Sequence, residues 1–487
     1  MSNFTDLSIK LTKQINNNTI KEEGIYFTPQ SIINKNLEII KKQNNLSIKS
    51  ILEPSCGSCE YINLLNNEFK NCNIVGIENN ETIYDGIKDL YTTHSNIKLL
   101  KKSYIDVDET NKYDLIIGNP PYFVIVDKKE QTNKTNNNNT YYKTIIDNIK
   151  TKNKLYKSYY DGRANMFILF ILHSLNKLNK NGILSFILPI NFINCLYYQK
   201  LRKYIYNNYK IIDIINCNSD KYLDTQQDTI IFIIQNCNNL NTLHKDINTQ
   251  TNNNTIIQNN DKFSLSKNNY TIFNTNENII KLNKLYEGNT KTLNDLNFKV
   301  SIGSIVWNQC TDYYNTTKIV KTQKTETTET PNITETTETQ NTKKKKSILF
   351  NADEYTKNDG KIKTRLIYNS DIVNKQLVFK KYNNKHKKNY INKEGNNEPL
   401  LVLNRGYGKG KYKLDYCLIN QEENYLIENH LMCIKHNTEK DKKKLIELYN
   451  EIIKSFNNSK TNEFIELYFG NNAINTTELQ HILPIFT

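Results

Sequence analysis

The sequence predicts an α/β fold in which a doubly wound, mainly parallel sheet is followed by a region of mixed α+β structure. Short apolar segments alternate with helix-like segments over residues 50–235, as in chains built from strand–helix–strand units. Polar or small residues follow several of these apolar segments directly, where parallel sheets bind their ligands. After residue 240 the chain becomes asparagine-rich and then less periodic, which indicates a second region.

The rest of the chain is organised around residues 114–123, Asp-Leu-Ile-Ile-Gly-Asn-Pro-Pro-Tyr-Phe. Leu115 to Ile117 predict a buried strand that ends at Gly118. The tetrad Asn119-Pro120-Pro121-Tyr122 follows, and its two prolines have no backbone N–H and force extended backbone before them. The expected result is a stiff corner in which the Asn119 amide and nearby carbonyls accept the hydrogens of an exocyclic amino group. Tyr122 adds an aromatic face on which a flat base stacks.

Three other strand ends carry acids, namely Glu53, Glu78 and Asp106. Because the carboxyl ends of parallel strands share one edge of a sheet, we expect these acids and Asn119 to converge on one crevice. Ser55 and Gly57 lie in a turn of small residues that opens a helix, where a ligand approaches the backbone closely. The chain has neither a G-x-x-x-x-G-K-[ST] nor a G-x-G-x-x-G motif, both of which bind phosphate groups. With three carboxylates at the crevice, the ligand is therefore expected to offer amino and hydroxyl donors and not phosphates.

The first 23 residues predict a polar helical lead-in, and the sequence Gly24-Ile-Tyr-Phe-Thr-Pro29 predicts a turn into a further helix. Thr28 is expected to cap that helix, with Pro29 at its first position.

Bulk composition indicates a nucleic-acid partner and a reducing compartment. The 487 residues carry a formal net charge of +15 with a pI near 9.0, which favours a polyanion over a membrane surface. The high lysine and asparagine content is also typical of an AT-rich genome, so the net charge alone is weak evidence for a nucleic-acid partner. Of nine cysteines only Cys56 and Cys59 form a C-x-x-C, so no metal site is predicted. No signal sequence or membrane span is expected, and we predict a soluble intracellular protein, in the cytoplasm or, if virus-encoded, in the viral host's cytoplasm.

The predicted organisation is a catalytic domain over residues 1–240, a linker over 241–275 and a second domain over 276–487 that binds DNA. Residues 324–346 repeat Thr-Glu-Thr-Thr-Glu-Thr and end in lysines, which is typical of a low-complexity insert. The second domain interleaves basic and aromatic residues, and we expect phosphate contacts there from Lys380, Lys381, Lys387, Lys388 and Arg405.

Taken in order, Phe-Thr-Pro, Glu-Pro-Ser-Cys-Gly-Ser, Gly-Ile-Glu, Ser-Tyr-Ile-Asp and Asn-Pro-Pro-Tyr resemble the gamma-class N6-adenine DNA methyltransferases, including those of restriction–modification systems. The resemblance covers the first 235 residues well and the remainder only loosely. It implies a Rossmann-like, S-adenosylmethionine-dependent domain with a carboxyl-terminal target-recognition domain. Duplex DNA is the implied partner, with a monomeric enzyme and a separate restriction endonuclease as further expectations.

The resemblance also assigns residues. Thr28 and Glu53 would lie near the methionine end of the cofactor, beside the turn of Ser55 and Gly57. Glu78 would hold the ribose hydroxyls and Asp106 the adenine amino group of the cofactor. Asn119 and the Pro120 carbonyl would hold the target amino group. Tyr122 and Tyr222 would stack on the two faces of the flipped base, with the ring face and not the hydroxyl expected to matter. The family often has glycine where Cys59 stands, which predicts some crowding of the turn.

Other functions share the tetrad, because cytosine N4, guanine amino groups in ribosomal RNA and glutamine amides are all planar amino groups. The Phe-Thr-Pro sequence, the late aromatic residue and the large basic second region favour DNA adenine. A non-catalytic DNA-binding module with a decayed methyltransferase domain is the alternative from a different class.

Overall fold

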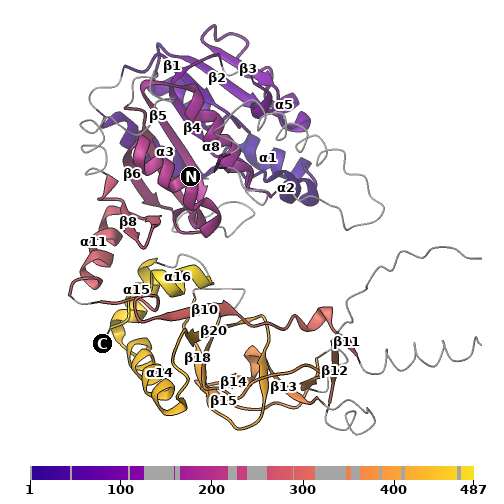
Figure 1. Ribbon diagram of the computed structural model, residues 1–487. Helices are drawn as coiled ribbons and strands as arrows, with labels where there is room; N and C mark the ends of the chain where they lie inside the picture. The colour runs from indigo at the N-terminus through magenta and orange to yellow at the C-terminus, as the bar shows by residue number, and fades with distance from the viewer. Residues whose placement is uncertain are drawn as a thin grey trace, which may run out of the picture. The chain divides into compact units, whose positions relative to one another are not determined.

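The computed structural model describes residues 3–43, 47–107, 110–124, 158–159, 165–217, 228–237, 260–288, 290–312, 347–351, 362–382, 387–406, 412–468 and 473–486. The chain divides into two compact units, Met1–Asn283 and Lys284–Thr487 (Figure 1). Tyr222 and the low-complexity insert 324–346 lie outside the described residues.

The first unit is built on a seven-stranded sheet in the order β3-β2-β1-β4-β5-β7-β6. All neighbouring pairs are parallel except those of β7, which runs antiparallel to β5 and β6. The doubly wound, mainly parallel sheet expected from the sequence is thereby confirmed. The strands are β1 (Ser50–Glu53), β2 (Asn73–Glu78), β3 (Ile97–Lys101), β4 (Tyr113–Gly118), β5 (Leu178–Pro189), β6 (Lys210–Asn216) and β7 (Thr229–Gln235).

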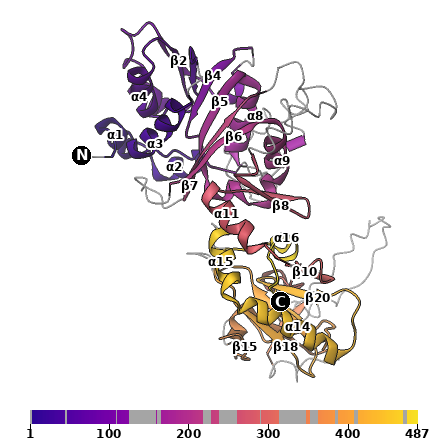
Figure 2. The ribbon, with the colours of Figure 1, turned by 90° about the vertical axis from the view of Figure 1, so that its left-hand side faces the viewer.

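Successive strand residues face opposite sides of this sheet, and each side has its own core. Ile51 and Leu115 belong to one core, while their neighbours Leu52 and Ile116 belong to the other. The first core is covered by α3 (Gln30–Lys41), α4 (Glu60–Glu68) and α5 (Glu81–Ile87), and the second by α8 (Met166–Lys177) and α9 (Gln199–Asn208) (Figure 2). Short 3-10 helices are η1 (Tyr104–Asp106), η2 (Ile190–Ile193) and η3 (Leu196–Tyr198).

The amino-terminal lead-in forms α1 (Asp6–Gln14) and α2 (Asn17–Glu23), as expected. Gly24 ends α2 in the left-handed conformation, with φ of 64°. The capping role expected for Thr28 is wrong, because Pro29 occupies the N-cap of α3 and no side chain caps this helix. The Thr28 hydroxyl instead accepts a hydrogen bond from Asn119 Nδ2 at 3.2 Å.

The linker expected over residues 241–275 is too long at its carboxyl-terminal end. Residues 260–275 are packed on the first unit through the hairpin of β8 (Ser264–Lys267) and β9 (Tyr270–Phe273). The buried Arg202 donates from Nε to the Thr271 carbonyl at 2.9 Å, and Phe273 is part of the core beneath α9. The unit boundary falls within α11 (Asn276–Leu285).

The second unit combines two larger sheets with helices, in agreement with mixed α+β structure. A four-stranded antiparallel sheet has the order β10-β20-β17-β18, and a five-stranded mixed sheet has the order β11-β12-β16-β13-β19. A hairpin of β14 and β15 completes the strands. The strands are β10 (Phe298–Ile302), β11 (Thr311–Asp312), β12 (Ile348–Phe350), β13 (Thr364–Ile367), β14 (Ile372–Val373), β15 (Gln376–Leu377), β16 (Tyr390–Ile391), β17 (Leu400–Asn404), β18 (Tyr416–Ile419), β19 (Tyr425–Ile427) and β20 (Leu431–His436).

In the described part of this unit the helices are η5 (Trp307–Gln309), η6 (Asn369–Asp371), α14 (Lys442–Phe456), α15 (Ser459–Tyr468) and α16 (Thr476–His481). The helix expected over Lys442 to Phe456 is confirmed. None of the helices in the described part of either unit combines the length and hydropathy needed to cross a bilayer.

Candidate active site

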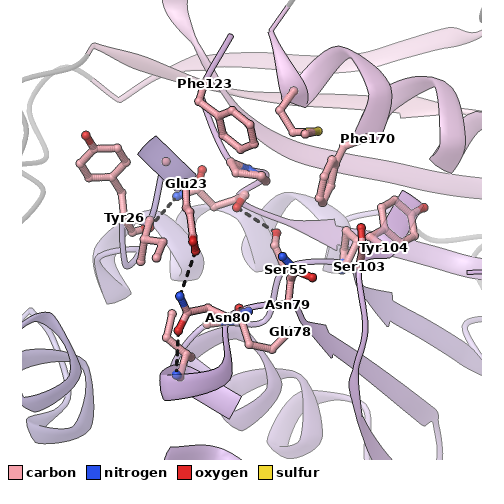
Figure 3. A pocket seen from close by; sticks show the side chains of 18 of the residues that line it. Glu23, Tyr26, Ser55, Glu78, Asn79, Asn80, Ser103, Tyr104, Phe123 and Phe170 are labelled. Atoms are coloured by element: carbon pink, nitrogen blue, oxygen red, sulfur yellow. Dashed lines mark hydrogen bonds between the residues drawn. The ribbon is translucent and has the colours of Figure 1, made fainter. Parts of the chain in front are cut away.

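A pocket opens at the carboxyl ends of β1, β2 and β4, where the doubly wound sheet was expected to bind its ligand (Figure 3). Its empty space, including the part open to solvent, is about 720 Å³. The walls come from five parts of the first unit: residues 23–27, the turns and loops after the strands, the start of α5, η1, and the first half of α8. They comprise Glu23, Gly24, Ile25, Tyr26, Phe27, Pro54, Ser55, Gly57, Glu78, Asn79, Asn80, Ile83, Ser103, Tyr104, Ile105, Asn119, Pro121, Phe123, Met166 and Phe170.

Glu78 ends β2 as a buried carboxylate held by backbone N–H groups. Its Oε2 accepts from Gly57 N at 2.9 Å and its Oε1 accepts from Asn80 N at 2.7 Å. Burial raises the pKa of Glu78 to about 7, although these backbone donors oppose the rise. A carboxylate has about four lone-pair sites. The backbone N–H groups of Gly57, Asn79 and Asn80 use three of them, so one acceptor site remains for a ligand in the pocket.

Gly57 lies in the turn after β1 with φ of +49°, which disfavours any residue with a Cβ. An added Cβ would also lie 3.3 Å from the Phe27 ring. The turn therefore brings bare backbone to the pocket, as a ligand at a helix N-terminus requires.

Asn80 links this turn region to the amino-terminal helices. Its Oδ1 accepts from Ile83 N and caps α5, while its Nδ2 donates to Glu23 Oε2 at 2.9 Å (Figure 3). Glu23 is the last residue of α2. The contact fixes the wall of residues 23–27 against the loop that follows Glu78.

Glu53 ends β1 and is 2% exposed. Burial, with the neighbouring Cys59 and Glu78, raises the pKa of this carboxyl well above its usual range. Within the described residues its Oε2 has no hydrogen-bond partner. Glu53 therefore lies beneath the pocket and does not line it, and its place near the methionine end of a cofactor remains a prediction.

Residues 119–122, here called the amide corner, follow β4 and are fixed by side chains from elsewhere. Asn119 Nδ2 donates to the Tyr26 carbonyl at 3.1 Å and to Thr28 Oγ1 at 3.2 Å. These two acceptors identify the nitrogen of the amide, so the other atom is its acceptor oxygen. The Tyr122 hydroxyl donates to Asn119 Oδ1 at 2.6 Å and also lies 2.8 Å from the Ile187 carbonyl, which competes for the same proton. Ser55 Oγ donates to the Asn119 carbonyl at 3.0 Å, which joins the corner to the turn after β1.

Gly24 brings the amino-terminal wall into direct contact with the amide corner. A Cβ at this position would lie 2.6 Å from Tyr122 N and 3.3 Å from the Pro121 carbonyl carbon. Contacts that close do not occur, so the two segments pack backbone to backbone. The wall and the corner therefore hold their positions together.

The structure differs from the expectations for Asp106 and Cys59. Asp106 is exposed in η1 and is not among the pocket-lining residues, whereas Ser103, Tyr104 and Ile105 just before it are. The reason is that β3 ends at Lys101 and a 3-10 turn intervenes. Cys59 adopts the left-handed conformation expected of glycine, with φ of 65°, but it is fully buried and does not line the pocket, so it does not crowd the cavity.

Most of the pocket wall consists of residues that no sequence motif had indicated. Glu23, Tyr26, Phe27, Asn80 and Phe170 line the cavity, yet none belongs to a strand-end motif. The Gly-Ile-Tyr-Phe-Thr-Pro turn was the available signal, because a glycine beside aromatic residues marks a close approach. Phe123 also lines this cavity, while Tyr122 and Pro120 do not. The second stacking residue, Tyr222, lies outside the described residues.

The five basic residues assigned to DNA differ in exposure. Lys380, Lys381 and Arg405 are exposed. Lys388 is only 8% exposed, which contradicts its assignment to phosphate contacts. Lys387 is half-buried, with Nζ 4.2 Å from the centroid of the Tyr368 ring and 4.5 Å from that of Tyr382, and burial lowers its pKa. Composition identified a basic region, but it did not distinguish surface lysines from packed ones.

The strand order, the ligand pocket at the carboxyl ends and the buried acid at the end of β2 define a Rossmann-like α/β domain with a nucleoside-type cofactor site. Residues 5–222 match the model of the Eco57I restriction-modification methylase family. This family match covers less than half of the chain.

The curated relatives are named as type II methyltransferases and a modification methylase. The type II methyltransferase M.AccI of Acinetobacter calcoaceticus is 29% identical over 42% of this chain and 38% of its own length. M.CvrRI of Paramecium bursaria Chlorella virus XZ-6E is 25% identical, over 48% of this chain and 54% of that enzyme. The modification methylase CviBIII of virus NC1A is 26% identical over 42% of this chain and 47% of its own length. The chain thus matches about half or less of each relative.

Among solved structures, a class I S-adenosylmethionine-dependent methyltransferase of Listeria monocytogenes is 17% identical with a TM-score of 0.36, over 50% of this chain and 68% of that one. The fold assignment depends on the strand order and not on this likeness.

The family implies S-adenosylmethionine, and the pocket fits it. Glu78 offers an acceptor for a ribose hydroxyl, and the apolar Ile83, Ile105 and Phe170 offer surfaces for an adenine ring. No group of three or more His, Cys, Asp or Glu suited to a metal was found in the described ranges.

Proposed function

We propose that this protein transfers a methyl group from S-adenosylmethionine to the N6 amino group of an adenine flipped out of duplex DNA. The observation that carries the proposal is the orientation of Asn119. Its Nδ2 is held by Tyr26 and Thr28, so its Oδ1 is presented as an acceptor next to the pocket. A carbonyl oxygen has two lone pairs, and the Tyr122 hydroxyl uses one of them.

The remaining lone pair suits an amino hydrogen of the target base. The nitrogen of an exocyclic amino group is a poor nucleophile because its lone pair is delocalised into the ring. An acceptor that pulls on the amino hydrogen draws the nitrogen toward tetrahedral geometry and stabilises the positive charge that develops. The bound cofactor supplies an electrophilic methyl, and the fixed corner holds the amino group close to it. The base must leave the helix stack to reach this position.

The second unit is proposed to bind and read the DNA. Support comes from exposed basic residues of this unit, such as Lys380, Lys381 and Arg405. The monomeric state and a separate endonuclease remain predictions.

The decisive experiment expresses the protein in a host without DNA methylation and sequences the DNA for modified bases. We expect N6-methyladenine at one short sequence, and none with Asn119→Ala as the matched control. N4-methylcytosine at that sequence would mean that the target base is cytosine and not adenine. Unmodified DNA together with S-adenosylmethionine binding by calorimetry would favour the RNA or glutamine alternatives, and loss of cofactor binding would favour the decayed module.

A further inference from the structure

In the second unit, residues 378–381 form a loop after β15 that exposes two large apolar side chains beside two lysines. Val378 is 45% exposed and Phe379 is 48% exposed. Lys380 and Lys381 are also exposed. Exposed apolar residues are usually isolated, so two adjacent ones next to paired charges need an explanation.

The backbone of this loop is fixed from beneath, so its exposed side chains do not result from poor packing. Val378 N donates to the Asp371 carbonyl at 2.7 Å, and Lys380 N donates to Asp371 Oδ1 at 3.1 Å. Asp371 itself is fully buried. The Lys380 carbonyl accepts from Asn389 Nδ2 at 2.7 Å and from an Arg365 guanidinium nitrogen at 3.0 Å.

Arg365 also positions the Phe379 ring. Its guanidinium carbon lies 4.6 Å from the centroid of Phe379 and 5.5 Å from that of Tyr390. Arg365 is only 8% exposed, so this cation–π contact is partly desolvated and therefore stronger than a surface one. Phe379 is thus held on one side by a buried cation while about half of its surface faces solvent.

A preorganised aromatic residue flanked by lysines fits a partner that has anionic edges and an apolar interior. Duplex DNA has this chemistry, because its phosphates line the grooves and its bases present apolar surface within them. Apolar side chains that enter a groove next to basic residues are a known mode of DNA contact. Lys363, whose Nζ lies 4.5 Å from the Tyr390 ring centroid, adds a further positive charge to this region.

We propose that the loop of residues 378–381 is a DNA-contacting element, in which Phe379 contacts the bases and Lys380 and Lys381 hold the flanking phosphates. The inference depends on the proposed function, since it assumes a DNA substrate. Asp371, Asn389 and Arg365 are positioning residues, because they act through the loop backbone and the Phe379 ring.

The test measures binding of the full-length protein to duplexes that contain the methylated sequence, by fluorescence anisotropy over a range of salt concentrations. Phe379→Ala should weaken binding by about fivefold or more, the threshold for an energetically important contact, with an unchanged salt slope. The double variant Lys380→Gln/Lys381→Gln should flatten the slope of log affinity against log salt by about 1.8, since each phosphate contact contributes about 0.9.

Matched controls come from the same unit. Lys442→Gln/Lys443→Gln removes two exposed charges from the start of α14, and Ile302→Ala removes an apolar side chain that is 43% exposed. Both should match the wild-type protein in affinity and slope. Thermal unfolding and S-adenosylmethionine binding of every variant separate loss of contact from loss of structure. In addition, 5-iododeoxyuridine in the duplex should photocrosslink to the peptide that contains Phe379.

The possible outcomes distinguish failure of the loop proposal from failure of the proposed function. A wild-type protein that neither binds nor methylates DNA would overturn the proposed function. A wild-type protein that methylates DNA, with loop variants that behave like the two controls and no crosslink at Phe379, would overturn this inference alone.

Discussion

The two halves of the active-site pocket are stabilised in different ways. The half around Glu78 and Gly57 is held by backbone N–H groups within and next to the sheet. The amide corner is held by side chains and carbonyls from remote segments: Tyr26, Thr28 and Ile187. The first half is therefore a local consequence of strand ends, whereas the second depends on the tertiary fold. Variants in the two halves should differ in which step of the reaction they affect.

The largest expected effect is at the amide corner. Asn119→Ala removes the oriented acceptor and should lower the methyl-transfer rate by about 100- to 1,000-fold, as for other preorganised polar contacts to a developing charge. Affinity for S-adenosylmethionine, measured by calorimetry, should stay near the wild-type value. An equal loss of both quantities would mean that the two halves of the pocket are not separable.

A substitution between the halves should affect both. Gly24→Ala places a Cβ 2.6 Å from Tyr122 N and forces a side chain into the left-handed conformation, with φ of +64°. We expect a displaced wall, weaker cofactor binding and methyl transfer reduced by up to about 100-fold, the typical effect of a 1 Å misplacement.

Gly288 provides the control for this strain. Its φ is +91° and a Cβ there would have no neighbour within 4 Å. Gly288→Ala should therefore lower stability by roughly 1 kcal/mol and leave activity unchanged. If both alanine variants behave alike, strain and not the contact with the amide corner explains the effect.

Strand-end chemistry explains which parts of this site the sequence could predict. Glu78 ends β2, Asn119 directly follows β4, and Gly57 lies in the turn after β1. Their positions therefore follow from local periodicity and from the shared edge of a parallel sheet. Glu23 and Tyr26 become site residues because the end of α2 packs beside the amide corner. Gly24 between them indicates a close approach, but the sequence does not say which segment it approaches. Asp106 does not line the pocket, because a 3-10 turn between β3 and this residue places it outside the pocket wall, and the strand pattern does not predict that turn. The burial of Lys388 was likewise not predictable, because the lysine content of a segment does not indicate which of its lysines are buried.

The burial of Glu78 should make the free energy of unfolding depend on pH. The folded pKa of about 7 lies above the ordinary value of 4.5 because the carboxyl is buried, so the folded state binds an extra proton between these values. The resulting stability is fully present below about pH 4.5 and is lost as pH rises through about 7. The change in the free energy of unfolding is on the order of 3 kcal/mol for a fully coupled group. Glu53 contributes with the same sign.

Glu78→Gln should flatten this pH dependence in denaturant titrations of the cofactor-free protein, since glutamine does not titrate. It should also weaken S-adenosylmethionine binding by about tenfold, through loss of a charge-assisted hydrogen bond. Wild-type affinity should increase as pH rises through about 7, because ribose hydroxyls prefer the carboxylate. The exposed Glu81→Gln is the control. A wild-type profile that Glu78→Gln does not alter would leave Glu78 as an ordinary strand-end acid.

The smallest expected effect concerns the Tyr122 hydroxyl, for which the sequence predicted no role. In the structure this hydroxyl donates to Asn119 Oδ1 at 2.6 Å, so it helps to orient the acceptor that the target amino group needs. Tyr122→Phe removes one hydrogen bond of about 0.5–1.5 kcal/mol, and the turnover rate should fall by about two- to tenfold with cofactor affinity unchanged. Tyr122→Ala also removes the stacking face, worth a further 1–3 kcal/mol or so, and should alter 2-aminopurine emission at the target position. Wild-type turnover by Tyr122→Phe would show that Tyr26 and Thr28 alone orient Asn119, and that the ring face is all the corner needs from Tyr122.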